Sequence, residues 1–244
     1  MKVLVSQHTP TNMAPFEMLQ NKFGAEVEFH PFFVMEALSG KEFRAKKINL
    51  PDYTAVVFSS RLAIDAYFKL CEEMRFKVPE TMKYFCTTEA VAMYLQKHIV
   101  YRKRKIFFGT GTPDSVIALI GPKHKGEKFL IAASDGSNSV PITDVFEKAG
   151  LDYTLGTVAK AVPQDLSGLD IHSYGIVVLY SPFDVASLKE SFPDFQQGDI
   201  KFISFGKSVV GAMEEAGLQI ALKAPTPEAP SAGKAIEICL ESMK

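Results

Sequence analysis

Short apolar runs that alternate with amphipathic stretches are the feature that most limits how this chain can fold. Runs of four to six residues rich in Val, Ile, Leu and Phe are typical of buried strands, and most are followed by a helical pattern. Regular alternation of strand and helix predicts βαβ units and parallel sheets covered by helices. Strands are expected at Lys2–Ser6, Thr54–Phe58, Lys83–Cys86, Lys105–Phe108, Lys128–Ala132, Tyr174–Leu179 and Lys201–Phe205. Helices are expected at Leu62–Glu73, Glu89–Lys97, Ser139–Lys148, Asp184–Ser191 and Ser208–Glu215.

An internal repeat divides the chain. The segment AVVFSSRLAIDAYF, residues 55–68, is echoed by GIVVLYSPFDVASL, residues 175–188, so that Ser60 matches Ser181. Likewise, YFCTTEAVAMYL from Tyr84 resembles ISFGKSVVGAME from Ile203. A third match runs the other way along the chain, because KFLIAASDG and FEKAGLDY in the middle resemble KVLVSQHTP and QNKFGAEV at the start.

This order of repeats predicts that one domain is inserted in the other. The expected fold is α/β, with two parallel-sheet domains of the flavodoxin or Rossmann type. Residues 1–34 with 163–244 are expected to form one domain and residues 35–162 the other, each long enough for its own core. The two crossings, near Glu26–Val34 and Tyr153–Val162, are extended and rich in Val, Phe and Thr. We expect them to join the domains as a two-stranded β-ladder.

The composition of the 244-residue chain limits its partners and its compartment. The formal net charge is −1, so no overall field attracts nucleic acid or an anionic membrane. No apolar run approaches the ~20 residues of a transmembrane helix, and MKVLVSQ is typical of a first strand rather than a signal peptide. Three widely spaced cysteines and five scattered histidines predict reduced thiols and no metal centre. We therefore expect a cytoplasmic protein with no metal centre that binds neither nucleic acid nor membranes. We also expect it to be a monomer.

Small hydroxyl residues and glycines follow most of the expected strands. In open parallel sheets, ligands bind beyond the carboxyl ends of the strands, where the N–H groups of helix N-termini attract carboxylates and phosphates. N-capping also explains Ser and Thr at such positions, and for any single residue it is the favoured interpretation. Two matching sets, one per domain, favour a shared ligand cleft. The candidate substrate-binding residues are Ser59, Ser60, Arg61, Thr88, Ser181, Lys207 and Ser208.

Other functions fit these motifs less well. A serine nucleophile is disfavoured because FSSRLA is not G-x-S-x-G and no His and Asp partners stand in an interpretable order. Nucleotide binding is disfavoured because GTGTPDS, residues 109–115, lacks the third glycine of the dinucleotide motif and the GK[ST] of a P-loop. The basic run YRKRK, Tyr101–Lys105, is interpreted first as a solvated edge before a strand. The alternative is that it attracts a small polyanionic ligand.

The order and spacing of several motifs resemble the uroporphyrinogen-III synthase family over nearly the whole chain. VVFSSRLAIDAYF looks like that family's strand ending in Thr-Ser before a helix, and VVLYSPFDV looks like its second such element, F-x-S-P. FGKSVVGAMEEAGL is similar to its G-x-x-T-A…G block, and the tail APTPEAPSAGKAI also fits.

The resemblance implies two α/β domains joined by a β-ladder, with the active-site cleft between them. It also implies a reaction in which hydroxymethylbilane, a linear tetrapyrrole with eight carboxylates, loses its hydroxyl. Ring D then attacks through its substituted carbon to give a spiro intermediate, which fragments and recloses with ring D inverted. No cofactor is required, so catalysis would consist mainly of positioning the chain and assisting the leaving hydroxyl.

Two family positions are changed in this sequence. The family often has a tyrosine in the second crossing, in a V-Y-x-T pattern, which has been proposed to assist departure of the hydroxyl. Here TVAKAVP places Ala159 at that position, with Tyr153 six residues earlier. The threonine of G-x-x-T-A becomes Val209 in one domain and Glu89 in the other.

Two hypotheses therefore stand. The first is an active synthase that relies on backbone groups. The alternative is a catalytically impaired relative that binds a tetrapyrrole or another polyanion, or that acts as an interaction protein.

Overall fold

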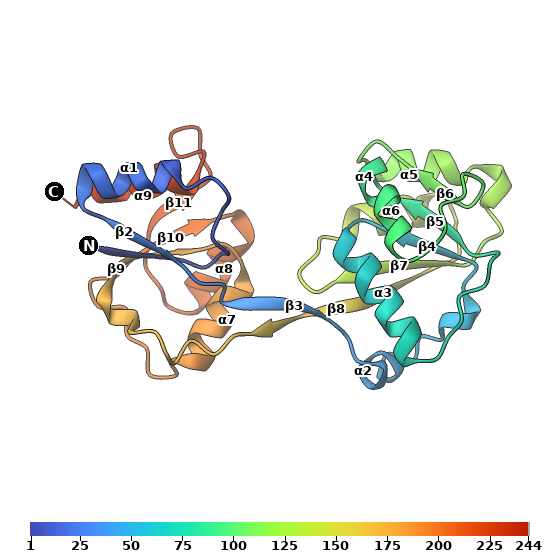
Figure 1. Cartoon of the computed structure of the whole chain (residues 1–244), viewed down its shortest axis with the longest axis horizontal. Helices are drawn as coiled ribbons and strands as arrows, with labels where there is room; N and C mark the ends of the chain where they lie inside the picture. Colours follow the sequence, from blue (N-terminus) through green and yellow to red (C-terminus); the bar gives the residue numbers. More distant parts are fainter. Residues whose placement is uncertain (244) are drawn as a thin grey trace. The chain divides into compact units, whose positions relative to one another are not determined.

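The structure is a computed structural model that describes residues 1–243. The chain divides into two compact units, Met1–Val34 with Val162–Lys244, and Met35–Ala161. It passes between the units within strands β3 (Phe33–Ala37) and β8 (Tyr153–Pro163) (Figure 1). These two strands are neighbours in the strand order of one sheet.

The first unit contains a five-stranded sheet in the order β11-β10-β9-β1-β2, and its neighbouring strands are parallel. The strands are β1 (Lys2–Val5), β2 (Glu26–Phe29), β9 (Tyr174–Leu179), β10 (Lys201–Phe205) and β11 (Ile220–Ala224). The helices are α1 (Ala14–Phe23), α7 (Pro182–Ser191), α8 (Lys207–Glu215) and α9 (Ala232–Ser242). Numbered by their order within this unit, the strands follow the 2-1-3-4-5 arrangement of flavodoxin.

The second unit contains a six-stranded sheet in the order β3-β8-β7-β4-β5-β6, in which β8 to β6 are parallel. Its other strands are β4 (Ala55–Phe58), β5 (Lys83–Cys86), β6 (Ile106–Phe108) and β7 (Phe129–Ser134). Its helices are α2 (Gly40–Ala45), α3 (Arg61–Glu73), α4 (Glu89–Tyr94), α5 (Pro113–Ile120) and α6 (Val140–Lys148). Counted from β4, the parallel strands follow the 3-2-1-4-5 order of the Rossmann fold.

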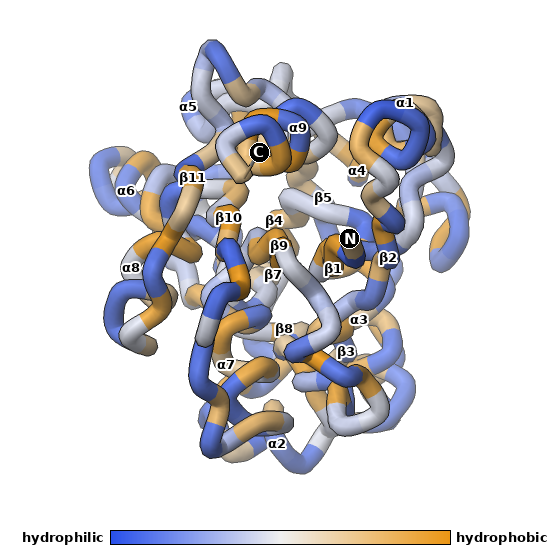
Figure 2. The backbone as a smooth tube through the Cα atoms, turned by 90° about the vertical axis from the view of Figure 1, so that its left-hand side faces the viewer, coloured by the Kyte–Doolittle hydropathy of each residue, from blue (hydrophilic) through white to orange (hydrophobic). Residues whose placement is uncertain are grey.

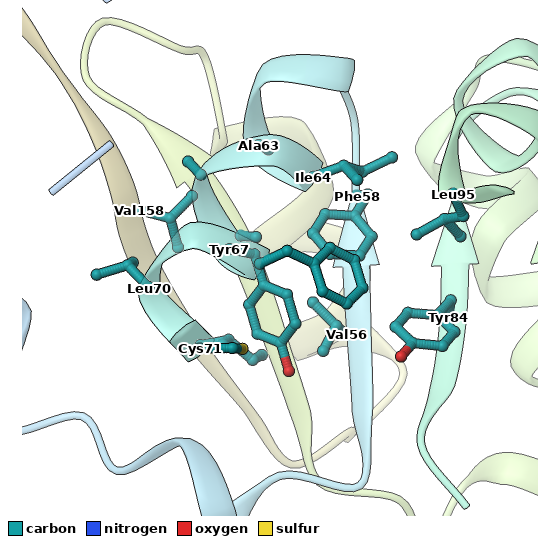
Figure 3. Close-up of a cluster of buried hydrophobic side chains, with 14 of the residues drawn as sticks. Val56, Phe58, Ala63, Ile64, Tyr67, Leu70, Cys71, Tyr84, Leu95 and Val158 are labelled. Atoms are coloured by element: carbon teal, nitrogen blue, oxygen red, sulfur yellow. The ribbon is translucent and has the colours of Figure 1, made fainter. Parts of the chain in front are cut away.

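Helices cover both faces of each sheet, which explains the continuous apolar runs in the strands. In β4 all four residues are buried, with Val56 and Phe58 in the cluster beneath α3. Figure 3 shows Phe58 beside Tyr67 and Tyr84, with ring centroids 5.5 and 6.3 Å away.

The helices of the first unit bury only one side. In α1, hydrophilic and hydrophobic segments alternate along the turns (Figure 2), and Leu19 on its inner side is buried. Helices α1 and α9 pack on the same apolar cluster as Val3 and Val178, whereas α7 and α8 pack on the other face of the sheet, with Leu4.

The predicted α/β class is confirmed, and the predicted strands lie at or within two residues of the observed ones. One local prediction is corrected. Residues Glu26–Phe29 do not belong to a crossing ribbon, because they form β2 and pair with β1. Strand β11 was not predicted from the sequence, because IALKA carries a lysine and two alanines among its five residues and therefore gives a weak apolar signal. None of the helices within residues 1–243 has the length and apolar content to cross a membrane.

Candidate functional site

The strand order of the second unit reverses between β4 and β7. The chain builds β4, β5 and β6 outward in one direction and then places β7 and β8 on the other side of β4. In open parallel sheets, ligands bind beyond the carboxyl ends of the two strands that flank such a reversal. These ends carry Ser59 after β4 and Ser134 at the end of β7.

A pocket of about 270 Å³ lies at this reversal. Its polar lining comes from loops that follow four adjacent strands, and its apolar lining comes from β4, β7 and the first turns of α5 and α6. A hollow of this size, with a few convergent polar groups, is typical of a small-ligand subsite. The polar lining residues are Ser59, Thr87, Gly111, Ser137, Asn138 and Ser139.

The predicted hydroxyls at these strand ends divide into two kinds. Ser60 caps α3, since its Oγ accepts a hydrogen bond from the Ala63 N–H at 3.1 Å. Thr88 caps α4 in the same way. Ser59 is exposed, lines the pocket and forms no side-chain hydrogen bond with the described residues, so its hydroxyl is available to a ligand.

The loop after β6 is held by Ser115. The Ser115 Oγ accepts from the Thr110 N–H at 3.0 Å and donates to the Thr112 carbonyl at 2.6 Å. A Cβ at Gly109 would lie only 2.2 Å from this Oγ, so the tight loop requires glycine there. This loop places Gly111 in the lining of the pocket.

Arg61 is exposed in the first turn of α3, with its guanidinium carbon 5.4 Å from the centre of the Tyr94 ring. The Tyr94 hydroxyl donates to Asp65 at 2.7 Å. Burial raises the Asp65 pKa, but hydrogen bonds from Tyr94, His98 and Lys97 outweigh it and leave that pKa below its usual value. The charged Asp65 therefore fixes the ring on which Arg61 lies.

The first unit has a similar reversal between β1 and β9. Ser6 follows β1, and Ser181 follows β9 and caps α7, with its Oγ accepting from the Phe183 N–H at 3.2 Å. Ser6 and the predicted residue Ser181 therefore lie at the strand ends beside which ligands of flavodoxin-like sheets bind.

Asp184 joins the two strand ends. One carboxylate oxygen, Oδ2, accepts from Ser6 Oγ at 2.7 Å, from the Tyr180 N–H at 2.8 Å and from the Ser181 N–H at 3.0 Å. The side chain is fully buried, and its Oδ1 has no partner among the described residues. Burial raises the pKa of this carboxyl, and the three hydrogen bonds offset only part of the effect.

Lys207 and Ser208 open helix α8, and both are exposed. The helix has no side-chain cap, because its N-cap residue is Gly206, whose φ of 131° disfavours other residues. Neither side chain forms a hydrogen bond or ion pair with the described residues. The first unit thus offers a free ammonium, a free hydroxyl and uncapped N–H groups at one helix end.

The sequence predicts the strand ends but does not indicate every residue of the candidate site. The loop Ser137–Ser139 carries no motif, and Asp184 resembles an ordinary helix-start acid until its burial is known. The changed family positions, Ala159 and Val209, are both fully buried. Tyr153 donates to Glu147 at the amino end of β8 and takes no part in the strand-end clusters.

No group of three or more His, Cys, Asp or Glu side chains within the described chain is placed to hold a metal ion. The three cysteines are free and buried. Burial raises the pKa of Cys71 and Cys86 to about 12, so neither thiol is activated as a nucleophile.

Comparison with known proteins identifies the family that shares this arrangement. The profile of the uroporphyrinogen-III synthase HemD family matches residues 16–232. The uroporphyrinogen-III synthetase structure from Helicobacter pylori 26695 aligns with a TM-score of 0.56 and 13% identity, covering 100% of this chain and 99% of that one. A mutant uroporphyrinogen III synthase from the extremely thermophilic bacterium Thermus thermophilus aligns with a TM-score of 0.48 and 12% identity, with 100% and 98% coverage. A sequence search of curated proteins found no match.

Proposed function

The chain belongs to the uroporphyrinogen-III synthase family of cyclising lyases in tetrapyrrole biosynthesis, and we propose that it closes hydroxymethylbilane by positioning the substrate rather than by covalent catalysis. The observation that supports this mechanism best is the pair of strand-order reversals with helix N-termini and free hydroxyls beside them. Neither cluster contains an activated nucleophile.

The substrate's eight carboxylates suit these strand ends. Ser59 and Arg61 in the second unit, and Lys207 and Ser208 in the first, have side chains free to bind carboxylates. Ser60, Thr88 and Ser181 act mainly by capping, which fixes the helix ends whose remaining N–H groups bind an anion. Together these seven residues form the proposed substrate-binding set.

The proposed chemistry follows from holding a flexible chain in one conformation. The substrate hydroxyl leaves as water after receiving a proton, and the electron pair of the adjacent pyrrole forms the exocyclic double bond. Ring D attacks through its substituted carbon, the spiro intermediate fragments, and reclosure at the free carbon releases a proton. Fixing the reacting carbons close together reduces the entropic barrier to the spiro step.

We also propose that residues 1–34 with 163–244 and residues 35–162 act as two domains. The chain is proposed to work in the cytoplasm as a monomer, with a linear tetrapyrrole as its small-molecule ligand and no nucleic-acid or membrane partner. Sedimentation of the purified chain at several concentrations tests the oligomeric part of this proposal.

Product analysis tests the main proposal. The purified chain, supplied with fresh hydroxymethylbilane, is expected to give the III isomer. A yield of only the I isomer, equal to that of a reaction without protein, would refute the synthase function. Saturable tetrapyrrole binding with only the I isomer would instead establish the alternative, a binding relative without turnover.

Variants then test the proposed binding set. Lys207→Ala is expected to raise KM about three- to tenfold through loss of one exposed charge contact, with a smaller change in kcat. Lys189→Ala is the matched control, because Lys189 is an exposed lysine of α7 outside the strand ends. Equal KM values for the two variants would remove Lys207 from the binding set.

A further inference from the structure

The amino ends of β5, β6 and β7 in the second unit form a basic edge, opposite the candidate site. Asp52 and Asp152 precede the neighbouring strands β4 and β8. Residues 75–128 contain eleven Lys and Arg against four Asp and Glu, whereas the whole chain has a net charge of −1. Strands β7, β4, β5 and β6 are neighbours, and three of them begin at or just after a lysine: Lys128, Lys83 and Lys105. Lys83 is neutralised by Glu127, but Lys105 is not so closely paired.

A hollow of about 200 Å³ lies on this edge. Its walls are apolar, from Val78, Met82, Ile99 and Val100, and its cations are Arg102 and Lys105. Val100 is 78% exposed, more than any other large hydrophobic side chain of residues 1–243. The hollow therefore combines uncovered apolar surface with two positive charges.

Glu80 shows what these cations attract. Its Oε2 lies 3.9 Å from Arg102 Nη1 and 3.9 Å from Lys105 Nζ. Both distances exceed a hydrogen bond, and the Glu80 side chain is 85% exposed. A carboxylate thus lies between the two cations without forming a direct bond to either, so an incoming carboxylate can replace it at little cost.

Tyr84 supplies a further polar group. It is only 3% exposed, lines the hollow, and its hydroxyl has no hydrogen-bond partner among the described residues. Figure 3 shows this hydroxyl directed away from the arrowheads of the strands, toward their amino ends. The buried polar atoms without a partner in residues 1–243 are His124 Nδ1, Asp184 Oδ1 and Ser204 Oγ, so the Tyr84 hydroxyl is not one of them and can donate to water or to a ligand in the hollow.

We propose that this hollow, bounded by Arg102, Lys105 and Tyr84, binds a small organic monocarboxylate with an aliphatic body. The carboxylate lies between the two cations in place of Glu80, and the aliphatic part contacts Ile99 and Val100. The volume has room for roughly six or seven water-sized groups and is smaller than a usual drug-sized pocket of ~300 Å³ or more. It is therefore too small for a tetrapyrrole, and this site is independent of the proposed synthase function.

Titration of the ¹⁵N-labelled full chain with 4-methylpentanoate tests the proposal. Saturable chemical-shift changes are expected at backbone amides of 78–84 and 99–106, while 4-methylpentanamide, which has the same body without the charge, produces none there. Glu80→Gln is expected to tighten binding about two- to fivefold, because it removes the competing carboxylate. The double variant Arg102→Gln with Lys105→Gln is expected to weaken binding about tenfold or more.

Lys103→Gln is the matched control, because Lys103 belongs to the same basic run but does not line the hollow. If Lys103→Gln weakens binding of 4-methylpentanoate as much as the double variant does, the effect comes from the overall positive charge of the edge, and the proposed site is refuted. The absence of saturable shifts in both the unchanged chain and Glu80→Gln would also overturn it. An acetylated Leu-Glu-Leu peptide that binds more tightly than 4-methylpentanoate would reassign the hollow to an acidic protein segment and reject the small-acid ligand.

Discussion

Asp184 offers the sharpest test of the candidate site in the first unit, because one buried carboxylate joins the ends of β1 and β9. Asp184→Ala removes the acceptor for the Ser6 hydroxyl and for the N–H groups of Tyr180 and Ser181. Asp184→Asn keeps one acceptor oxygen in the same place and replaces the unpartnered Oδ1 with an amide group. The two variants therefore separate the loss of the hydrogen bonds from the loss of the charge.

The magnitude follows from these contacts. Each buried donor left without a partner costs about 1–3 kcal/mol, so three of them predict a loss of at least ~3 kcal/mol in Asp184→Ala. For a chain of this length, that corresponds to a decrease of roughly 6–12 °C in Tm. Asp184→Asn keeps the shape and the acceptor, and it is expected to stay within about 1.5 kcal/mol of the unchanged chain at neutral pH.

The sign of the pH dependence comes from the raised pKa of Asp184, which is caused first by burial. Between the unfolded pKa near 3.9 and the higher folded value, the folded state binds more protons than the unfolded state. The contribution of Asp184 to stability is therefore fully present below pH ~3.9 and is lost as pH rises through the folded pKa. Asp184→Asn has no such titration, so its stability relative to the unchanged chain should improve as pH rises, by at most about 1.4 kcal/mol per pH unit.

Urea unfolding followed by circular dichroism, from pH 3.5 to 7.5, measures both effects. The free energy of unfolding of Asp184→Asn minus that of the unchanged chain should increase with pH across the acidic range. If this difference stays constant or decreases with pH, burial of the charged Asp184 carboxylate does not destabilise the folded state. If Asp184→Ala lowers the free energy of unfolding by less than 1 kcal/mol, the three donors form hydrogen bonds with water in the variant.

Two further substitution pairs test the strand-end loops by thermal unfolding. Ser60→Ala should lower the free energy of unfolding by about 1 kcal/mol, because α3 loses its cap. Ser59→Ala removes no such bond and should change the free energy of unfolding by no more than ~0.5 kcal/mol. Equal losses in the two variants would contradict the different roles of these serines. Gly109→Ala should cost about 1–3 kcal/mol, because the new Cβ meets Ser115 Oγ at 2.2 Å. Gly211→Ala, in the exposed middle of α8 with open space around it, should instead stabilise the chain by about 0.5–1 kcal/mol, and a loss there would count against the helical reasoning.

The fold class was predictable because a strand covered on both faces must be apolar at every position. Ala55–Phe58 and the last four residues of Tyr174–Leu179 show this directly, and the continuation of both strands into a serine and a helix indicates the repeat. Strand β2 was harder to assign, since none of its residues is buried and its sequence EVEF carries no apolar run. The strand ends could be located from sequence because a parallel sheet places them all on one edge.

The roles of individual side chains could not be predicted in the same way. Ser59 and Ser60 are adjacent and chemically identical, yet only Ser60 turns its hydroxyl back to cap a helix. Asp184 and Asp114 both lie in the first turn of a helix that starts with proline, but only Asp184 is buried and bonded to a neighbouring strand. Burial depends on which strands become neighbours, and that information is distributed over the whole chain.

Ala159, at the position where the family often has a tyrosine, has a structural role in this chain. Ala159 is fully buried within the cluster that holds Val56 and Phe58, and its carbonyl accepts from the Asp135 N–H at 2.9 Å. A tyrosine ring there would overpack this core unless the strand moved. In this chain the position therefore serves packing and backbone hydrogen bonding. We expect assistance to the leaving hydroxyl to come instead from groups at the strand ends, where free hydroxyl, ammonium and N–H donors are concentrated.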